Sequence, residues 1–476
     1  MNIGYKAKQS KAHGNKIRSE LTQSTSGQCE DPPVDYVPPP SLFIICEWVL
    51  SAKECQSKGS REDLINDLEQ IYKALCLHHS ITKEFLEQSD ICRFLLVIAP
   101  QHDDLKLQLI SIKLIHVIIS KSVESIDIFL SFGGYHFINQ LPLFQNEQIK
   151  LLGFEILRYI PQTSLGTKEF LRTNTLTFLI ECFEASVQNS DDVFQQQILF
   201  CICCTFCNMC RFISMFPDNV PLLILGLFFD AMKRVDKPFP CQLSIEFSEG
   251  LLRYTKEKGL NQLVISHLFN QYNLLLRPDF PLHLQILQLF VQIADCCISS
   301  DSSIITKIDI NTVKAFLLGF PHDSKEFQCS ISIIKDFVVA KQHEKWITDP
   351  KIIKKLRDGI DAACFESKAL IVECISSICY CSSIEVLQQI FQTDLISACL
   401  DAVECLEGKR LKTVLITLRN ALQRMIRFGT DSFQNFDQFE DEFADVLKYN
   451  ADNENKEIAD VASAILQEFY PEIYYA

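Results

Sequence analysis

The segment with the clearest chemical potential is a cysteine-rich run, CICCTFCNMC, at Cys201–Cys210. Cys204, Cys207 and Cys210 stand at the spacing of metal-ligand pairs. A zinc site needs four ligands that converge as a tetrahedron, usually from two such pairs separated by a loop, and no second pair follows at that distance. The run also lies inside an apolar stripe with helical spacing, so we predict that these thiols pack between helices as small apolar side chains, with a metal site as the alternative. The same interpretation covers Cys296, Cys297, Cys379 and Cys381.

The local motifs that mark many enzymes are missing from the sequence. It contains no glycine-rich phosphate loop, no nucleophile elbow and no H-E-x-x-H pair. His78 and His79 stand near the end of a predicted helix, where a donor side chain suits the free carbonyl groups, which favours a helix end over a ligand or catalyst. We expect no catalytic residue, no metal and no cofactor; the alternative is an active site assembled from scattered residues.

Two basic segments could bind acidic partners, and the first is the predicted helix after Gly408. Its cations lie on neighbouring turns and are Lys412, Arg419, Arg424 and Arg427. The pattern predicts either a docking patch for an acidic partner or a solvated outer face. In a third interpretation the patch is paired within the chain to an acidic run downstream, which consists of Asp437, Glu440, Asp441, Glu442 and Asp445.

The second basic segment is Met1 to Pro40. It contains one early acid, Glu20, and its five cations are Lys6, Lys8, Lys11, Lys16 and Arg18. The segment closes with Pro32-Pro33 and Pro38-Pro39-Pro40, a composition that cannot build a packed core. We therefore predict a disordered tail over residues 1–40 and a folded part over residues 41–476. The tail either binds an acidic partner or only keeps the chain soluble.

The composition of the whole chain restricts its partners. The formal net charge of −15 and the pI near 5.2 argue against a nucleic-acid or anionic-membrane surface, because phosphate binding needs a basic footprint. Met1 to Glu30 is polar, so we expect no signal peptide, and the 21 Cys should stay reduced. The apolar runs Pro221–Phe229 and Ile198–Phe216 are too short or too polar to span a membrane. We expect a soluble protein of the cytoplasm, the nucleus or both.

The elements that would position all these residues are predicted to be recurring helices. Only 15 Gly and 17 Pro accompany 47% hydrophobic residues, which is too few turn formers for a sandwich or barrel. A polar cluster able to cap a helix recurs roughly every 41 to 46 residues and is followed by an apolar helical stripe. The clusters are Arg61-Glu62-Asp63, Asp103-Asp104, Asn146-Glu147, Asp191-Asp192, Asp236, Asp279, Asp323-Ser324, Glu366-Ser367, Glu407-Gly408 and Asn453-Glu454. One helix pair cannot cover its own apolar face, so about ten such units must stack into an all-α solenoid with an extended concave surface.

The C-terminal part of the chain resembles the armadillo-repeat family and, within it, the importin-α family. The segments that carry the resemblance are VLITLRNALQRMIRFG (Val414–Gly429) and DQFEDEFADVLKYNADNENKEIADVASAILQEFY (Asp437–Tyr470), which are similar to the last two repeats of that family. A short basic tail before the repeats also resembles its importin-β-binding segment. The resemblance implies an armadillo-type right-handed superhelix. It also implies an adaptor that holds an extended peptide or a helix along its concave face and an importin-β-type receptor by its tail.

The sequence departs from that family at the residues that would hold cargo. Importin-α proteins carry Trp and Asn four residues apart on the third helix of successive repeats. The corresponding pairs here are Ile112 with His116, Glu155 with Tyr159, and Phe200 with Cys204. The chain has only two Trp, so it cannot build a ladder of cation–π pockets.

The leading prediction from the sequence is a non-enzymatic adaptor or scaffold that binds other proteins, with transport between cytoplasm and nucleus as its expected setting. One alternative is an armadillo scaffold unrelated to transport, of a cytoskeletal or signalling kind. Another, from a different class, is a metal protein or enzyme that uses the cysteine-rich helix.

Overall fold

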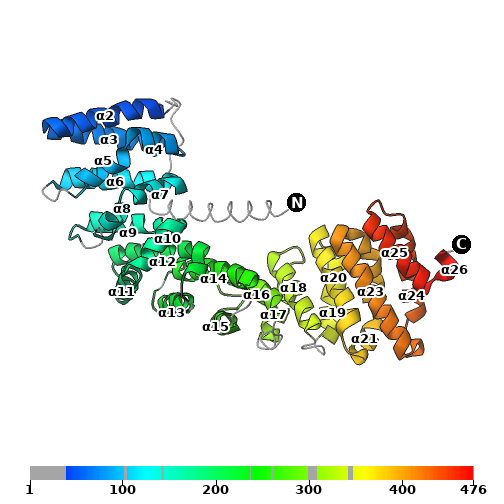
Figure 1. The fold of residues 1–476 in the computed structure, drawn as a ribbon. Helices are drawn as coiled ribbons and strands as arrows, with labels where there is room; N and C mark the ends of the chain where they lie inside the picture. The colour runs from blue at the N-terminus through cyan, green and yellow to red at the C-terminus, as the bar shows by residue number, and fades with distance from the viewer. Residues whose placement is uncertain are drawn as a thin grey trace. The chain divides into compact units, whose positions relative to one another are not determined.

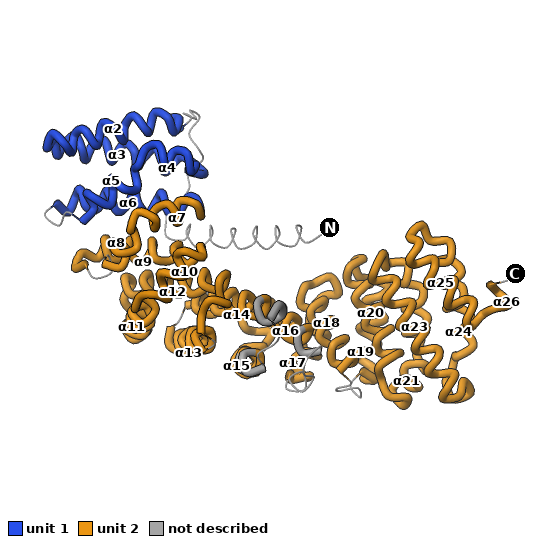
Figure 2. Tube along the Cα trace, in the orientation of Figure 1, with its two compact units in different colours: residues 1–122 blue, residues 123–476 orange. Residues whose placement is uncertain are grey.

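The computed structural model describes residues 39–100, 104–140, 144–217, 219–235, 237–258, 262–298, 308–340 and 347–474. These residues form helices and turns, with no strand among them. They group into two compact units, unit 1 over residues 1–122 and unit 2 over residues 123–476 (Figure 2). The sequence predicted one folded part over residues 41–476, without a boundary between residues 122 and 123. Of the predicted tail, only Pro39 and Pro40 lie within the described residues.

Unit 1 consists of two helical repeats. Its helices are α2 (Leu42–Lys58), α3 (Arg61–Leu77), α4 (Lys83–Ser89), α5 (Ile91–Ile98) and α6 (Leu105–Lys121). The turn between α2 and α3 depends on Gly59, whose φ of 72° is a left-handed conformation that glycine adopts without a Cβ clash. There the Gly59 N–H donates to the Gln56 carbonyl over 3.1 Å, which closes α2. The longer helices of the two repeats, α3 and α6, contact each other.

Unit 2 continues the same design through a succession of helical repeats (Figure 1). Its helices are α7 (Val123–Ser131), α8 (Gly134–Gln140), α9 (Glu147–Leu157), η2 (Ile160–Gln162), α10 (Ser164–Arg172), α11 (Thr175–Gln188), α12 (Val193–Met209), η3 (Cys210–Met215), α13 (Asn219–Arg234), α14 (Phe239–Lys258), α15 (Gln262–Tyr272), α16 (His283–Ile298), α17 (Ile310–Gly319), α18 (Lys325–Val339), α19 (Pro350–Ala362), α20 (Phe365–Cys381), α21 (Ile384–Phe391), α22 (Leu395–Asp401), η6 (Ala402–Cys405), α23 (Gly408–Phe428), η7 (Thr430–Ser432), α24 (Phe436–Ala451), α25 (Lys456–Phe469) and α26 (Pro471–Tyr474).

The last helix of each repeat in unit 2 contacts the last helix of the next repeat. We call this row of helices the ridge; it consists of α9, α12, α14, α16, α18, α20, α23 and α25. The preceding helices form an outer row, in which α11 contacts α13 and the series α17, α19, α22 and α24 is continuous. Each repeat is therefore stabilised by its neighbours, as in other repeat proteins.

The ridge helices begin where the sequence predicted capping clusters. Asn146 accepts a hydrogen bond from the Ile149 N–H, and Asp192, Ser324 and Asn455 cap α12, α18 and α25 in the same way. In unit 1, Asp104 caps α6. The clusters at residues 61–63, 366–367 and 407–408 lie at the starts of α3, α20 and α23. Of the remaining clusters, Asp279 precedes α16, while Asp103 and Asp236 lie outside the described residues. The predicted all-α solenoid fold is confirmed.

The core of unit 2 lies between the ridge and the outer row. A chain of buried rings illustrates it: Phe183 of α11 contacts Phe206 of α12, which contacts Phe228 of α13, which contacts Phe247 of α14. The successive ring centroids are 6.0, 6.3 and 5.7 Å apart. Because the rings alternate between the two rows, each repeat shares its core with the next.

The stretch Val193–Met215, which comprises α12 and η3, is long and apolar enough to cross a membrane, with a mean hydropathy of 1.8. The expectation that Ile198–Phe216 is too polar to span a membrane is therefore wrong on hydropathy alone. In the structure α12 packs against α9, α11 and α14, and much of it is buried by these neighbours. A buried helix of a large helical core has the same composition as a membrane span.

Candidate functional site

The ridge of unit 2 is the candidate binding surface. In a two-row stack of helices, the half-exposed side chains of one row lie side by side over many repeats. The residues that carry this surface are mostly polar and half-exposed: Gln242, Glu246, Gln285, Gln288, Gln292, Ser332, Lys335, Glu373, Ser377, Thr417 and Asn420. We refer to the contact between two consecutive ridge helices as a junction.

The cysteine-rich run lies on the ridge helix α12, except for Cys210, which begins η3. Cys201, Cys203 and Cys204 are buried, and the Cys207 thiol donates to the Leu243 carbonyl of α14 over 3.0 Å. Burial raises the pKa of the Cys203 thiol well above its usual range, so it stays protonated and unreactive. Among the described residues, no group of three or more His, Cys, Asp or Glu side chains could hold a metal ion. Cys379 is likewise buried, in α20.

The junction between α9 and α12 includes a hydrogen bond from a side-chain amide. The Asn208 side chain donates from Nδ2 to the Arg158 carbonyl over 2.6 Å, at the point where α9 ends. Glu155 lies on the same helix, and burial raises the pKa of its carboxyl. Of the pairs aligned with the Trp and Asn of importin-α, the first, Ile112 with His116, lies on α6 and the last, Phe200 with Cys204, lies on α12. In the middle pair, Glu155 lies on α9 and Tyr159 follows that helix. The Phe200 ring contacts the Phe239 ring edge to face.

At the next junctions, polar contacts join neighbouring ridge helices. Glu249 of α14 accepts a hydrogen bond from Gln292 of α16, and Arg253 lies 3.6 Å from Glu249 within α14. Burial raises the pKa of the Glu249 carboxyl, and these two partners oppose that effect.

The junction between α16 and α18 contains one carboxyl group from each helix. Asp295 of α16 is exposed, whereas Asp336 of α18 is only 1% exposed. The pKa of Asp336 is raised to about 7, first by burial and then by the negative charge of Asp295, while Lys335 opposes the shift. Among the described residues, Asp336 Oδ2 has no hydrogen-bond partner.

The junctions from α18 to α23 are tied by one carboxylate. Glu373 of α20, 17% exposed on its side chain, lies 3.6 Å from the Lys335 amine of α18. The Arg410 guanidinium of α23 binds the other side of the same carboxylate and also contacts Glu366 over 3.1 Å. Three consecutive ridge helices are thus linked by alternating charges.

The predicted basic patch of α23 lies on the ridge, and three of its four cations contact acceptor groups of the same chain. Lys412 pairs with Glu457 over 2.9 Å, and Arg419 pairs with Glu468 over 2.6 Å, both on α25. Arg424 donates to the Tyr380 carbonyl of α20 over 2.8 Å. Arg427 is exposed near the end of α23, and no ion pair to another described residue involves it.

The acidic run after α23 does not pair with that patch, so this interpretation of the sequence is wrong in its partners. Glu442 accepts hydrogen bonds from Ser397, and Asp445 pairs with Lys448 on its own helix. The acids that neutralise the patch, Glu457 and Glu468, belong to α25. The cations of the predicted tail, Lys6, Lys8, Lys11, Lys16 and Arg18, lie outside the described residues.

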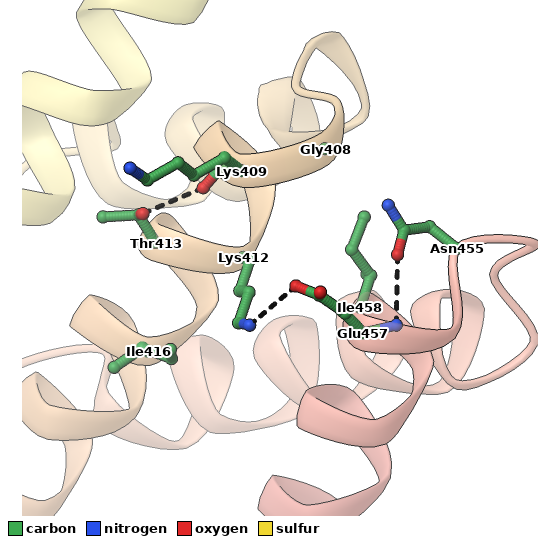
Figure 3. A pocket seen from close by; sticks show the side chains of 8 residues that line it. All are labelled: Gly408, Lys409, Lys412, Thr413, Ile416, Asn455, Glu457 and Ile458. Carbon is green, nitrogen blue, oxygen red and sulfur yellow. Dashed lines mark hydrogen bonds and ion pairs between the residues drawn. The ribbon is translucent and has the colours of Figure 1, made fainter. Parts of the chain in front are cut away.

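A shallow hollow of about 300 Å³ lies between α23 and α25 (Figure 3). Its lining consists of Gly408, Lys409, Lys412, Thr413, Ile416, Asn455, Glu457 and Ile458. Figure 3 shows the Lys412 amine directed at Glu457 across the hollow, while the Lys409 amine points away from it. The side-chain oxygen of Asn455 accepts a hydrogen bond from the Glu457 N–H and in this way caps α25. Of the two lysines in this lining, Lys412 is therefore paired with the lining carboxylate, that of Glu457.

No protein-family model matches the sequence, and no curated protein matches it. Among solved structures, the chain is similar to an engineered protein solved by crystallography, with a TM-score of 0.59 and 13% identity over 89% of this chain and 98% of that one. A structure from work on a phosphorylation switch between cadherin and β-catenin has a TM-score of 0.48 and 9% identity over 94% of both chains. The N-terminus of TSC2 has a TM-score of 0.39 and 11% identity over 84% of this chain and 99% of that one. At such identities the likeness concerns the fold alone.

Proposed function

We propose that this chain is a non-enzymatic scaffold that binds other proteins along the ridge of unit 2. The observation that carries the proposal is the unbroken series of junctions from α9 to α25, each with polar side chains left half-exposed. An extended segment or a helix laid on this surface would contact several repeats, so its affinity would be the sum of many modest contacts.

The test is to change the ridge surface without changing its core. Gln288→Arg, Ser332→Arg and Ser377→Arg together place three bulky cations on α16, α18 and α20 at half-exposed positions. A control with the same change in charge is Asn311→Arg, Gln392→Arg and Gln434→Arg, at residues outside the ridge. Proteins captured from native lysate and identified by mass spectrometry should be lost with the ridge variant and retained with the control. Equal capture by both variants would contradict the proposal.

The finer form of the proposal is an adaptor for transport between cytoplasm and nucleus, located in one or both compartments. Its support is the resemblance of Val414–Gly429 and Asp437–Tyr470 to importin-α, together with the basic composition of Met1 to Pro40. The isolated tail should then bind an importin-β-type receptor with an affinity that falls as salt rises. No binding at low salt would favour a cytoskeletal or signalling scaffold. Elemental analysis of the purified chain tests the alternative of a metal protein, which a stoichiometric metal would support.

A further inference from the structure

The outer face of α2, the first helix among the described residues, is more apolar than the end of a helical array should be. This helix packs against α3 and α4, and its buried residues are Ile45, Val49 and Ala52. On the opposite side of α2, Phe43 and Leu50 are 72% and 62% exposed. Terminal repeats of solenoid proteins need a polar outer face to stay soluble, so two large apolar side chains there indicate a surface that is covered in solution.

Acidic side chains alternate with the two apolar ones along this face. Four residues three or four positions apart lie on one side of the helix, and we call them the α2 stripe: Phe43, Glu47, Leu50 and Glu54. Glu54 pairs with Lys58 over 2.6 Å, whereas Glu47 is exposed and forms no ion pair with another described residue. The α2 stripe therefore fits a ligand that carries apolar and cationic side chains together.

A segment with this combination precedes α2 in the same chain. Residues 1–38 lie outside the described residues, and the described chain begins at Pro39, just before α2. Within that segment, Lys16-Ile17-Arg18 places one apolar side chain between two cations. This order is the complement of the α2 stripe, in which an acid separates two apolar side chains.

The chain between this segment and α2 is long enough to bring them together. Roughly twenty residues separate Arg18 from Pro39, and a flexible chain of that length has an end-to-end distance of about 25 Å. The far end of the stripe, Glu54, lies about 18 Å along the helix from the start of α2. A segment tethered in this way has an effective concentration on the order of millimolar, so a weak contact is enough to keep it bound.

We propose that Lys16-Ile17-Arg18 binds the α2 stripe of its own chain, with Ile17 on the apolar residues and a cation on Glu47. The inference goes beyond the proposed scaffold function, because it concerns unit 1 and not the ridge. The bound segment covers the outer face of α2 as a further repeat does in a longer array. An acidic partner of the tail must then compete with the α2 stripe for these cations.

The test measures how fast chymotrypsin cleaves the native full-length chain after Leu21, three residues beyond Arg18 in the sequence. When Lys16-Ile17-Arg18 is bound, this site is less accessible, and exposed segments are the preferred sites of cleavage. One variant, Phe43→Ser/Leu50→Ser, removes the apolar part of the α2 stripe. A second variant, Glu47→Lys, reverses the charge of its unpaired acid.

The matched controls change exposed residues of unit 1 outside the α2 stripe. Leu77→Ser/Val97→Ser removes two apolar side chains that are 60% and 58% exposed, on α3 and α5. Glu84→Lys reverses an exposed acid of α4 and gives the same change in net charge as Glu47→Lys. These controls separate the stripe from general effects of surface polarity and charge on the protease.

We expect cleavage after Leu21 to be about threefold faster in Phe43→Ser/Leu50→Ser than in the unaltered chain, and about twofold faster in Glu47→Lys. Both controls should be cleaved at the rate of the unaltered chain. Equal rates in all five proteins overturn the inference, as does an acceleration in the controls as large as in the stripe variants. A cleavage rate constant that falls as the chain concentration rises also overturns it, because the stripe then binds a second copy.

Discussion

Two neighbouring junctions of the ridge share helix α18 and yet differ in their pattern of charges. Toward α20 and α23, Lys335, Glu373 and Arg410 alternate in sign and link three helices. Toward α16, the next residue along the chain, Asp336, is buried, and the negative charge of Asp295 adds to the rise of its pKa. At both junctions α18 nevertheless packs against its neighbour, and its buried apolar residues, such as Ile334 and Phe337, contribute to this packing. The comparison teaches that apolar burial builds the stack, while charge distinguishes one repeat from the next.

The largest expected effect comes from removing the charge of Asp336. Its carboxyl pKa is about 7 in the folded chain and near 4 when unfolded, so the folded state holds the proton more tightly. The contribution of this carboxyl to the free energy of unfolding is therefore largest at low pH and falls as pH rises from about 4 to about 7. Between about pH 5 and about pH 8, the unaltered chain should lose about 2 kcal/mol relative to Asp336→Asn. Urea unfolding at both pH values measures this difference; parallel pH profiles for the two proteins would refute the burial of a charge at this junction.

Removing a charge at the junctions of α20 with α18 and α23 should instead lower the free energy of unfolding. Glu373→Gln leaves Lys335 and Arg410 without their shared, part-buried counter-charge, so we expect a loss of about 1 to 2 kcal/mol. The control is Glu366→Gln, which removes the exposed second partner of Arg410 and should cost less than about 0.5 kcal/mol. Hydrogen exchange of α18 and α20 amides localises the effect. If Glu366→Gln cost as much as Glu373→Gln, burial would not explain the strength of this contact.

The smallest effect is expected where the ridge is most exposed, at the junction between α23 and α25. Lys412 pairs there with Glu457, which is 76% exposed, and Arg419 pairs with Glu468. Lys412→Gln and Arg419→Gln should each change the free energy of unfolding by less than about 0.5 kcal/mol, and added salt should remove the difference. A larger change in the melting of α25 would show that these pairs have a structural role beyond solvation.

The sequence predicts the repeats well because their signals are local. A cap such as Asn146 or Asn455 acts on amides two or three residues away, so its position in the chain reveals where a ridge helix begins. The charge contacts of the ridge are not local. Glu373 and Arg410 are 37 residues apart, and Lys412 and Glu457 are 45 apart, so their pairing depends on which turns of successive helices face each other. For this reason the sequence alone does not reveal that Lys412 and Arg419 pair with Glu457 and Glu468, and Asp336 carries no sequence signal that it is buried.

The buried thiols of unit 2 have a practical consequence for following how its repeats separate. Cys203, Cys374 and Cys399 are at most 1% exposed, whereas Cys76 and Cys364 are exposed. A thiol reagent should modify the exposed pair at once and reach the buried ones only when adjacent repeats separate. Because the buried thiols belong to α12, α20 and α22, the order in which they react records which part of unit 2 separates first. The native thiols therefore report local unfolding by their rates of modification, and no label has to be introduced at another position.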